Sequence, residues 1–244
     1  GESNVFFTGN WANNYYKSTT LIGGPPSDNN RWSDAKSWSS RVLPATGDTV
    51  VIDQRSGVSI DFDKDSFSGT LRTNNKVNVT GGNFTLLGTS VLDELNVTSG
   101  TVTLGGSTRV NRLTVEGGQV TFQGTAGANT IVVNAGLMTV GSSLNTASLE
   151  INGGTVQANA ALGTGIKDDA SVAISIKGGT LRVGSYLGAR SFEMTDGRLV
   201  LEYRADGPND PFKLPSIESL RLSGGAVLSA AIPALAPGVD IKKY

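Results

Sequence analysis

Acidic, aromatic and basic residues gather in two stretches of the chain and in the segment between them. One stretch lies between Val156 and Val172, and the other lies between Leu201 and Ile217. Two carboxylates separated by roughly 5–10 Å can hydrolyse a glycosidic bond, and aromatic rings pack against the apolar faces of sugars. These residue types therefore predict a polysaccharide-binding groove. Its candidate residues are Asp168, Asp169, Tyr186, Arg190, Tyr203, Asp206 and Asp210.

All 3 tryptophans of the chain lie near its N-terminus, within residues 1–45. We expect this segment to cap the first turn of the fold and to shield it from edge-to-edge association. The alternative interpretation is an aromatic platform for sugar rings. The candidate residues of this platform are Trp11, Trp32 and Trp38.

Three aspartates, Asp61, Asp63 and Asp65, alternate with other residues. Alternate side chains of an extended segment share one face, so these carboxylates can be placed to coordinate calcium. An EF-hand loop is excluded, because Ser66 and Arg72 stand where that loop needs glycine and glutamate. The competing interpretation is a solvated loop that leaves the first strand. We expect no cofactor, with calcium as the one alternative.

The composition excludes several classes of function. The chain has 20 Lys and Arg against 21 Asp and Glu and no basic stripe, so we do not expect a nucleic-acid partner. It has no Cys and no His, which excludes disulfides, zinc sites built on these residues and histidine acid–base catalysis. No apolar run has the length of a membrane span. Gly1 stands in place of an initiator Met, and we interpret it as the mark of a removed signal sequence.

A repeat of 18 residues organises the chain, and two longer gaps equal one repeat plus an insertion. The residues five and three before each repeat glycine, and two and four after it, are apolar throughout, with Ser229 as the exception. Apolar alternation on both sides of a glycine predicts two half-buried strands joined by a turn. The repeat glycines are Gly82, Gly100, Gly118, Gly136, Gly154, Gly179, Gly197 and Gly225.

Repeated strand–turn–strand units predict a β-solenoid, in which the parallel strands of successive coils stack on one another. A left-handed β-helix has a similar period but needs an aliphatic residue at every sixth position. Thr103 and Thr121 stand at such positions, so we favour a single-stranded right-handed parallel β-helix of about eight to nine coils. We divide the chain into an N-terminal capping segment 1–45, a β-solenoid 46–232 and a C-terminal cap or linker 233–244.

The repeat also predicts where the two insertions lie. Both leave the coil after the same strand, so we expect both at one edge of the stack, two coils and roughly 10 Å apart. Tyr186 and Arg190 belong to the coil between them. Insertions on one face of a solenoid often mark its binding face. The alternative is a pair of tolerated surface loops.

Threonine stands three residues after four consecutive repeat glycines, at Thr85, Thr103, Thr121 and Thr139. Stacked threonines are typical of the solvated face of a parallel sheet. A flat threonine array can instead bind ice. Because Gln157 follows in the fifth coil and breaks the row, we favour the solvated sheet.

The segment that opens the solenoid carries Trp32-Ser33-Asp34, Trp38, Pro44, Gly47-Asp48-Thr49-Val50-Val51-Ile52 and Val58-Ser59-Ile60-Asp61. This pattern resembles the opening segment of bacterial cell-surface and autotransporter-like β-solenoid proteins. It is also similar to the start of the G8 domain of extracellular proteins. The resemblance implies an extracellular or surface-anchored β-solenoid, and it supplies no catalytic residue.

These features favour a non-catalytic β-solenoid, secreted or displayed on a bacterial surface, that acts as scaffold, adhesin or glycan-binding module. We expect a polysaccharide or cell-surface glycan as its partner. One alternative is a polysaccharide lyase or glycoside hydrolase of the β-helix type. Another is a segment of a trimeric phage-type fibre or spike. The outward positions are mostly polar, which favours a monomer over the fibre.

Overall fold

The computed structural model describes residues 4–6, 31–38, 41–52, 59–144, 146–162, 172–184, 186–202 and 216–231. Within these ranges the regular structure is almost all β-strand, with one short 3₁₀ helix, η1 (Ala35–Ser37). The strands form one 17-stranded sheet that coils on itself, and all of their pairings are parallel. The predicted all-β parallel solenoid is confirmed, with about eight turns.

Each regular turn contains two strands joined by a glycine corner. We call the strands before the corner the first sheet (β6, β8, β10, β12, β14 and β16) and those after it the second sheet (β7, β9, β11, β13, β15 and β17). The long strands β4 and β5 run through the corner and belong to both. The bounds are β1 (Asn4–Phe6), β2 (Thr49–Ile52), β3 (Ser59–Phe62), β4 (Ser66–Leu86), β5 (Val91–Leu104), β6 (Arg109–Val115), β7 (Gln119–Phe122), β8 (Gly127–Val133), β9 (Leu137–Val140), β10 (Ser148–Ile151), β11 (Thr155–Ala158), β12 (Ala173–Ile176), β13 (Thr180–Val183), β14 (Gly188–Met194), β15 (Arg198–Glu202), β16 (Ser216–Leu222) and β17 (Val227–Ala231).

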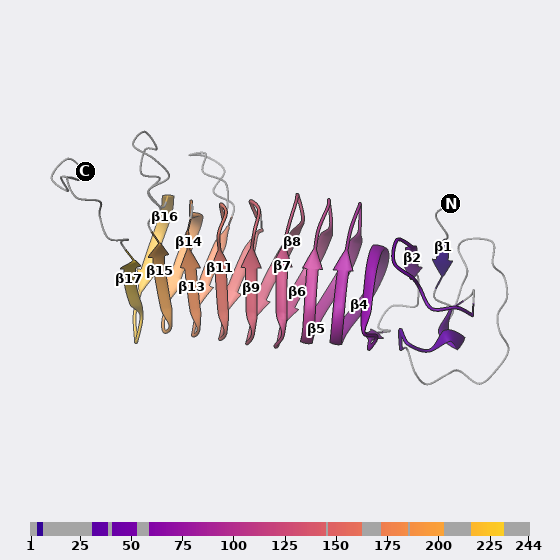
Figure 1. The fold of residues 1–244 in the computed structure, drawn as a ribbon. Coiled ribbons are helices and arrows are strands. Elements are labelled where there is room, and N and C mark those ends of the chain that lie inside the picture. The colour runs from indigo at the N-terminus through magenta and orange to yellow at the C-terminus, as the bar shows by residue number, and fades with distance from the viewer. Residues whose placement is uncertain are drawn as a thin grey trace, which may run out of the picture.

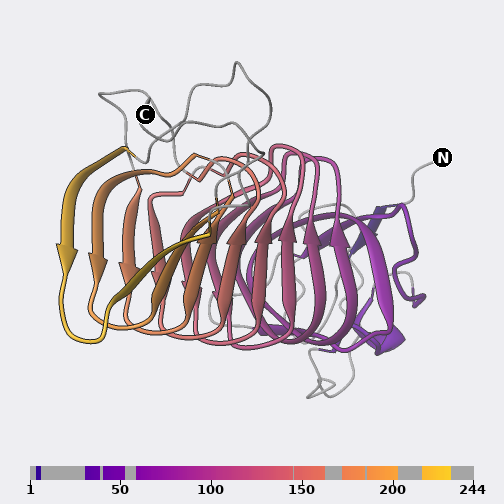
Figure 2. The ribbon, with the colours of Figure 1, turned by 60° about the vertical axis from the view of Figure 1, so that its left-hand side comes forward.

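The solenoid winds in one direction along its whole length. In Figure 1 the turns advance from right to left, and the second-sheet strands run upward in front of the first-sheet strands. In Figure 2 the first-sheet strands of the C-terminal turns run downward at the left of the picture and pass into the second sheet at the bottom. This winding is right-handed, as the failure of the six-residue pattern predicted.

The predicted inward residues form the core. From Val77 to Met194, the residues five and three positions before each corner glycine are at most 2% exposed. They stack in register from turn to turn, as Leu113, Ile131 and Leu149 do. Because each turn buries its apolar face only against its neighbours, the stack of turns is the folding unit.

The apolar alternation in the sequence did not reveal a third set of inward-facing positions. Ten and eight residues before the corner glycine, side chains also point into the core, as Thr108 (0% exposed) and Val110 (3%) do. The Thr108 hydroxyl donates to the Gly105 carbonyl over 2.6 Å, which satisfies the buried polar group. Small or polar residues hold this row in several turns, so it lacks the apolar alternation of a strand. Examples are Ser90, Thr108, Ala126, Thr146 and Ala189, all buried.

The corner glycines are required for two reasons. Gly118 has a φ of +68°, in the left-handed region that L side chains rarely adopt. A Cβ on Gly118 would also lie 2.5 Å from the carbonyl oxygen of Gly100, the corner glycine of the preceding turn. The corners therefore stack backbone on backbone, and only glycine fits there.

An aromatic cluster closes the N-terminal end of the core. Trp32 and Trp38 are both 0% exposed, and the centroid of the Trp32 ring lies 4.9 Å from those of Trp38 and Phe67. The rings of Phe62 and Phe84 lie 5.4 and 5.7 Å from Trp32. The capping segment also contributes β1, which pairs with β2. The described part of the segment thus caps the first turn.

The last turn departs from the predicted repeat. Its corner glycine with positive φ is Gly224 (62°), and not Gly225. Leu228 pairs with the inward residue Leu199, so this corner is longer by one residue than the corners before it. The prediction that the inward row continues at Val227 is therefore wrong, because the extra residue shifts the register by one and exchanges the two faces of the strand.

Candidate functional site

Five predicted groove residues, Asp168, Asp169, Tyr203, Asp206 and Asp210, lie outside the described residues. The strands that precede the two insertions, β11 and β15, both pair with β13 in register. They end at the same edge of the stack, with one turn between them (Figure 1). The described flanks of the insertions therefore lie where the repeat predicted them.

The other two predicted groove residues are described. The Tyr186 carbonyl accepts a hydrogen bond from the Leu162 amide (2.9 Å), and its hydroxyl is buried without a hydrogen-bond partner among the described residues. Arg190 is exposed on β14, where its amide donates to the Val172 carbonyl (2.8 Å). Arg190 directly precedes Ser191, which lines the groove described below.

The tryptophan platform needs a correction. Trp32 and Trp38 are 0% exposed, and the Trp38 indole donates to the Trp32 carbonyl over 2.9 Å. Their rings are packed inside the cap and cannot stack on a sugar, so the platform interpretation is wrong for these two residues. Trp11 lies outside the described residues.

The structure separates the three aspartates that were candidates for calcium. β3 ends at Phe62, so the alternation that would align their side chains ends after Asp61. Asp61 accepts a hydrogen bond from Asn78 (2.8 Å), and Asp63 accepts two from Ser33 (2.9 and 2.6 Å). Asp65 is exposed at a bend. Within the described ranges, no three His, Cys, Asp or Glu side chains form a group that could hold a metal ion.

A groove crosses the outer face of the first sheet, where the sequence analysis placed no site. It consists of a hollow of about 490 Å³ over β6 to β16 and a hollow of about 290 Å³ over β4 to β8. Arg112 and Val132 line both hollows, so the two lie next to each other on the first sheet. We call them together the first-sheet groove.

Two rows of outward side chains make up this groove, each in register across the first sheet. The first row begins with charged residues and continues with five small ones: Lys76, Glu94, Arg112, Thr130, Ser148, Ala173, Ser191 and Ser219. The second row lies beside the first on the same strands, and its Glu150, Glu193 and Arg221 side chains are longer than the serines next to them. Its members are Asn78, Asn96, Thr114, Val132, Glu150, Ser175, Glu193 and Arg221. The hollow of about 490 Å³ lies over the strands on which the side chains of the first row are small.

Side-chain hydrogen bonds along the solenoid border the groove. On one side, the Asn134 amide donates to Glu116 (3.0 Å) and the Asn152 amide donates to Asn134 (2.8 Å). On the other side, a similar ladder with N–O distances of 2.9 and 3.5 Å joins Asp93, Asn111 and Asn129. These ladders hold the borders of the groove in place.

Two acidic residues of the groove, Glu150 and Glu193, lie beside cations. Lys177 Nζ lies 2.8 Å from Glu150 Oε1, and Arg221 Nε lies 4.0 Å from Glu193 Oε1. The hydrogen bond from Lys177 lowers the pKa of Glu150 below its ordinary value, with a further contribution from Asn152. A lowered pKa keeps this carboxylate ionised at neutral pH.

Replacing Lys177 with Met is expected to raise the pKa of Glu150 toward 4.5, because the group that stabilises its charged form is lost. Stabilisation by the pair is present above pH 4.5 and is lost as the pH falls through the lower folded-state pKa. Both side chains are more than one third exposed (54% and 37%), so stability at pH 7 should fall by less than about 1 kcal/mol. An NMR titration of the Glu150 carboxyl tests this, with Lys36→Met as the remote control. An unchanged Glu150 titration in Lys177→Met would contradict the assignment.

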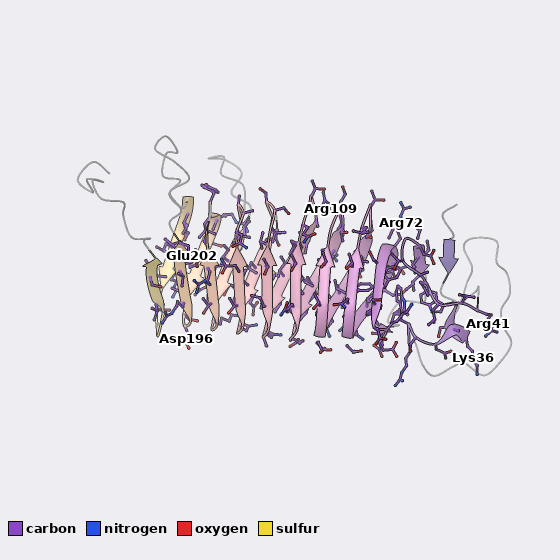
Figure 3. All side chains as sticks on the ribbon, in the orientation of Figure 1. Lys36, Arg41, Arg72, Arg109, Asp196 and Glu202 are labelled. Atoms are coloured by element: carbon purple, nitrogen blue, oxygen red, sulfur yellow. The ribbon has the colours of Figure 1, made fainter. Side chains whose placement is uncertain are left out.

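The outer face of the second sheet has a different character. Thr85, Thr103, Thr121 and Thr139 stack in register, as predicted. Gln157 and Arg182 continue the row, and Arg182 pairs with Glu202, its Nε lying 2.8 Å from Glu202 Oε1. Figure 3 shows the two edges of the stack. Asp196 lies at the edge formed by the glycine corners, and Arg109 lies at the opposite edge.

Comparison with known proteins found no matching family model, no matching curated protein and no matching solved structure. No helix in the described part of the chain is long and apolar enough to cross a membrane. The inference of function therefore rests on the fold and on the first-sheet groove.

Proposed function

We propose that this chain is an extracellular or cell-surface β-solenoid module that holds an extended glycan along the first-sheet groove without cutting it. The observation that carries the proposal is the register of five small residues across five parallel strands, which leaves a groove along the solenoid axis. The resemblance of residues 32–61 to the opening of bacterial surface solenoids supports the extracellular location.

The shape of the groove favours a polymer over a small molecule. Parallel strands lie roughly 4.8 Å apart, so the five small residues span about 19 Å along the axis. Each of these five strands presents a hydroxyl or a methyl group on the first row. A surface that repeats at this step fits a chain of repeating units, and one pyranose is of similar length.

The acidic residues of the groove favour binding over hydrolysis. A general acid needs a raised pKa, whereas the Lys177 hydrogen bond lowers the pKa of Glu150. The Glu193 side chain is 50% exposed and lies beside Arg221. Neither carboxylate has the apolar, buried setting in which glycosidases keep a proton on an acid. A hydrolase or lyase is therefore the second candidate.

Filling the groove tests the function. The double variant Ser148→Ile/Ser191→Ile should weaken binding to a soluble polysaccharide at least tenfold, because two branched side chains occupy the place of the chain. Thr121→Ile makes a similar change on the second sheet and should bind like the parent protein. Affinity electrophoresis against a polysaccharide panel, with and without calcium, measures both.

The competing locations and activities are separated in the same assay. Loss of binding in Asp206→Ala/Asp210→Ala, with normal binding in the groove variant, would move the site to the insertions. Release of shortened or unsaturated products would overturn the non-catalytic proposal. Equal binding by the groove variant and the parent would overturn the groove as the site. Sedimentation of the protein as a monomer would exclude the trimeric fibre.

A further inference from the structure

The charges on the first row of the first-sheet groove alternate in sign, and Glu150 and Glu193 of the second row each lie beside a cation. Glu94 lies in register between Lys76 and Arg112, on strands roughly 4.8 Å apart. Farther along, Glu150 pairs with Lys177 at 2.8 Å. A groove of this kind attracts neither a polyanion nor a polycation over long range, because its positive and negative charges cancel within a few ångströms.

The first row of the groove carries no charge from Thr130 to Ser219. Thr130, Ser148 and Ser191 offer hydroxyls there, each of which both donates and accepts a hydrogen bond. Ala173 stands between the two serines and presents only a methyl group. Such a surface complements sugar rings, which alternate hydroxyls with C–H faces.

An unsatisfied acceptor lies in the N-terminal hollow. The side-chain oxygen of Asn96 is buried and has no hydrogen-bond partner among the described residues. Asn96 lines the hollow together with Arg112, an exposed residue with a long side chain that can move aside for a ligand. Leaving a buried acceptor unpaired costs free energy in the unliganded protein, and a hydroxyl donor from a ligand removes that cost.

We propose, building on the glycan-binding function, that the ligand of the first-sheet groove is an uncharged polysaccharide and that Asn96 accepts a hydrogen bond from one of its hydroxyls. The chain runs parallel to the solenoid axis, with one sugar unit for each strand. It enters the larger hollow over Ser219 and Ser191 and passes Arg112 to reach Asn96. Because the groove carries paired charges, binding depends little on salt.

Two sets of probes test the ligand class. Hydroxyethylcellulose and galactomannan represent uncharged chains, and polygalacturonate and alginate represent anionic ones. We expect the uncharged chains to bind with a dissociation constant that changes less than twofold between 0.05 and 0.5 M NaCl, because no counterions are released. For uncharged oligosaccharides, affinity should rise with length and level off at about five to eight units, one for each strand crossed.

A single residue tests the contact. Asn96→Leu should weaken binding of the uncharged chains about tenfold, a cost in the range of one hydrogen bond to a ligand. Its melting temperature should not fall, because the variant removes an unpaired buried acceptor and not a hydrogen bond. Asn83→Leu, at an exposed residue on the second-sheet part of β4 and outside the lining of both hollows, is the control and should bind like the parent.

The outcomes separate the ligand class from the function. Groove-dependent binding of the anionic chains with a steep loss in salt would overturn the uncharged ligand and keep the glycan-binding function. Binding of uncharged chains that Asn96→Leu leaves unchanged would overturn the contact at Asn96. If Ser148→Ile/Ser191→Ile weakens no probe, both the function and this inference fail.

Discussion

Trp32→Ala is expected to destabilise the solenoid by about 3–5 kcal/mol, the cost of removing a large buried aromatic side chain. Trp32 is 0% exposed, and it is the residue against which the rings of Trp38, Phe62, Phe67 and Phe84 all pack. Its loss leaves a cavity in the middle of these four rings. The cluster also shields the first turn, before which the described residues form no regular turn, so the cap should weaken as a unit.

The position of the damage matters as much as its size. A solenoid is held together by contacts between neighbouring turns, so a damaged cap should open β2 to β4 first and leave β12 to β15 protected. Hydrogen exchange measured by mass spectrometry resolves the two regions, and chemical denaturation gives the total loss of stability. Val42→Ala, at a residue that is 66% exposed, is the control and should change stability by less than about 0.5 kcal/mol. Normal stability in Trp32→Ala would contradict the capping role.

Much of the fold follows from one physical constraint that the sequence displays openly. An inward residue must be apolar in every turn, so positions such as those of Leu113, Ile131 and Leu149 repeat visibly. The row of Thr108 is also inward, but its position near a corner lets a hydroxyl bond to a nearby carbonyl. Polar residues are tolerated there, and apolar periodicity cannot reveal the row. The longer corner at Gly224 was missed for another reason, because Gly225 beside it fits the same pattern.

The groove was predictable in part. The five small residues of the first row stand six residues before successive repeat glycines, a spacing that the sequence makes visible. Small outward residues carry no chemistry of their own, however, and only the register across the strands shows that they form a hollow. The ladder three residues after the glycines drew attention to the second sheet, where Thr103, Thr121 and Thr139 form an even surface. Paired charges such as Lys177 and Glu150 lie 27 residues apart in sequence, because an insertion separates them, and they meet because β10 and β12 stack in register.

Alanine at Gly118 is expected to cost roughly 2–5 kcal/mol, the sum of two separate penalties. One is the left-handed backbone, with a φ of +68°, which costs an L residue roughly 1–2 kcal/mol. The other is the added Cβ, which would lie 2.5 Å from the Gly100 carbonyl oxygen and push the two corners apart. Because Gly100 stacks in the same way on Gly82, the clash cannot be relieved by moving one turn alone.

Two other glycines separate the two penalties. Gly47 has a φ of +91° but no atom within 4 Å of an added Cβ, so Gly47→Ala should cost only the backbone penalty of roughly 1–2 kcal/mol. Gly81 has neither a positive φ nor a neighbour within 4 Å, so Gly81→Ala should be neutral or slightly stabilising. Denaturation of the three variants should therefore rank Gly118 well above Gly47, and Gly47 above Gly81. Equal losses at Gly118 and Gly47 would mean that the corners do not press on one another, and the stacked backbone would not be what requires glycine in each turn.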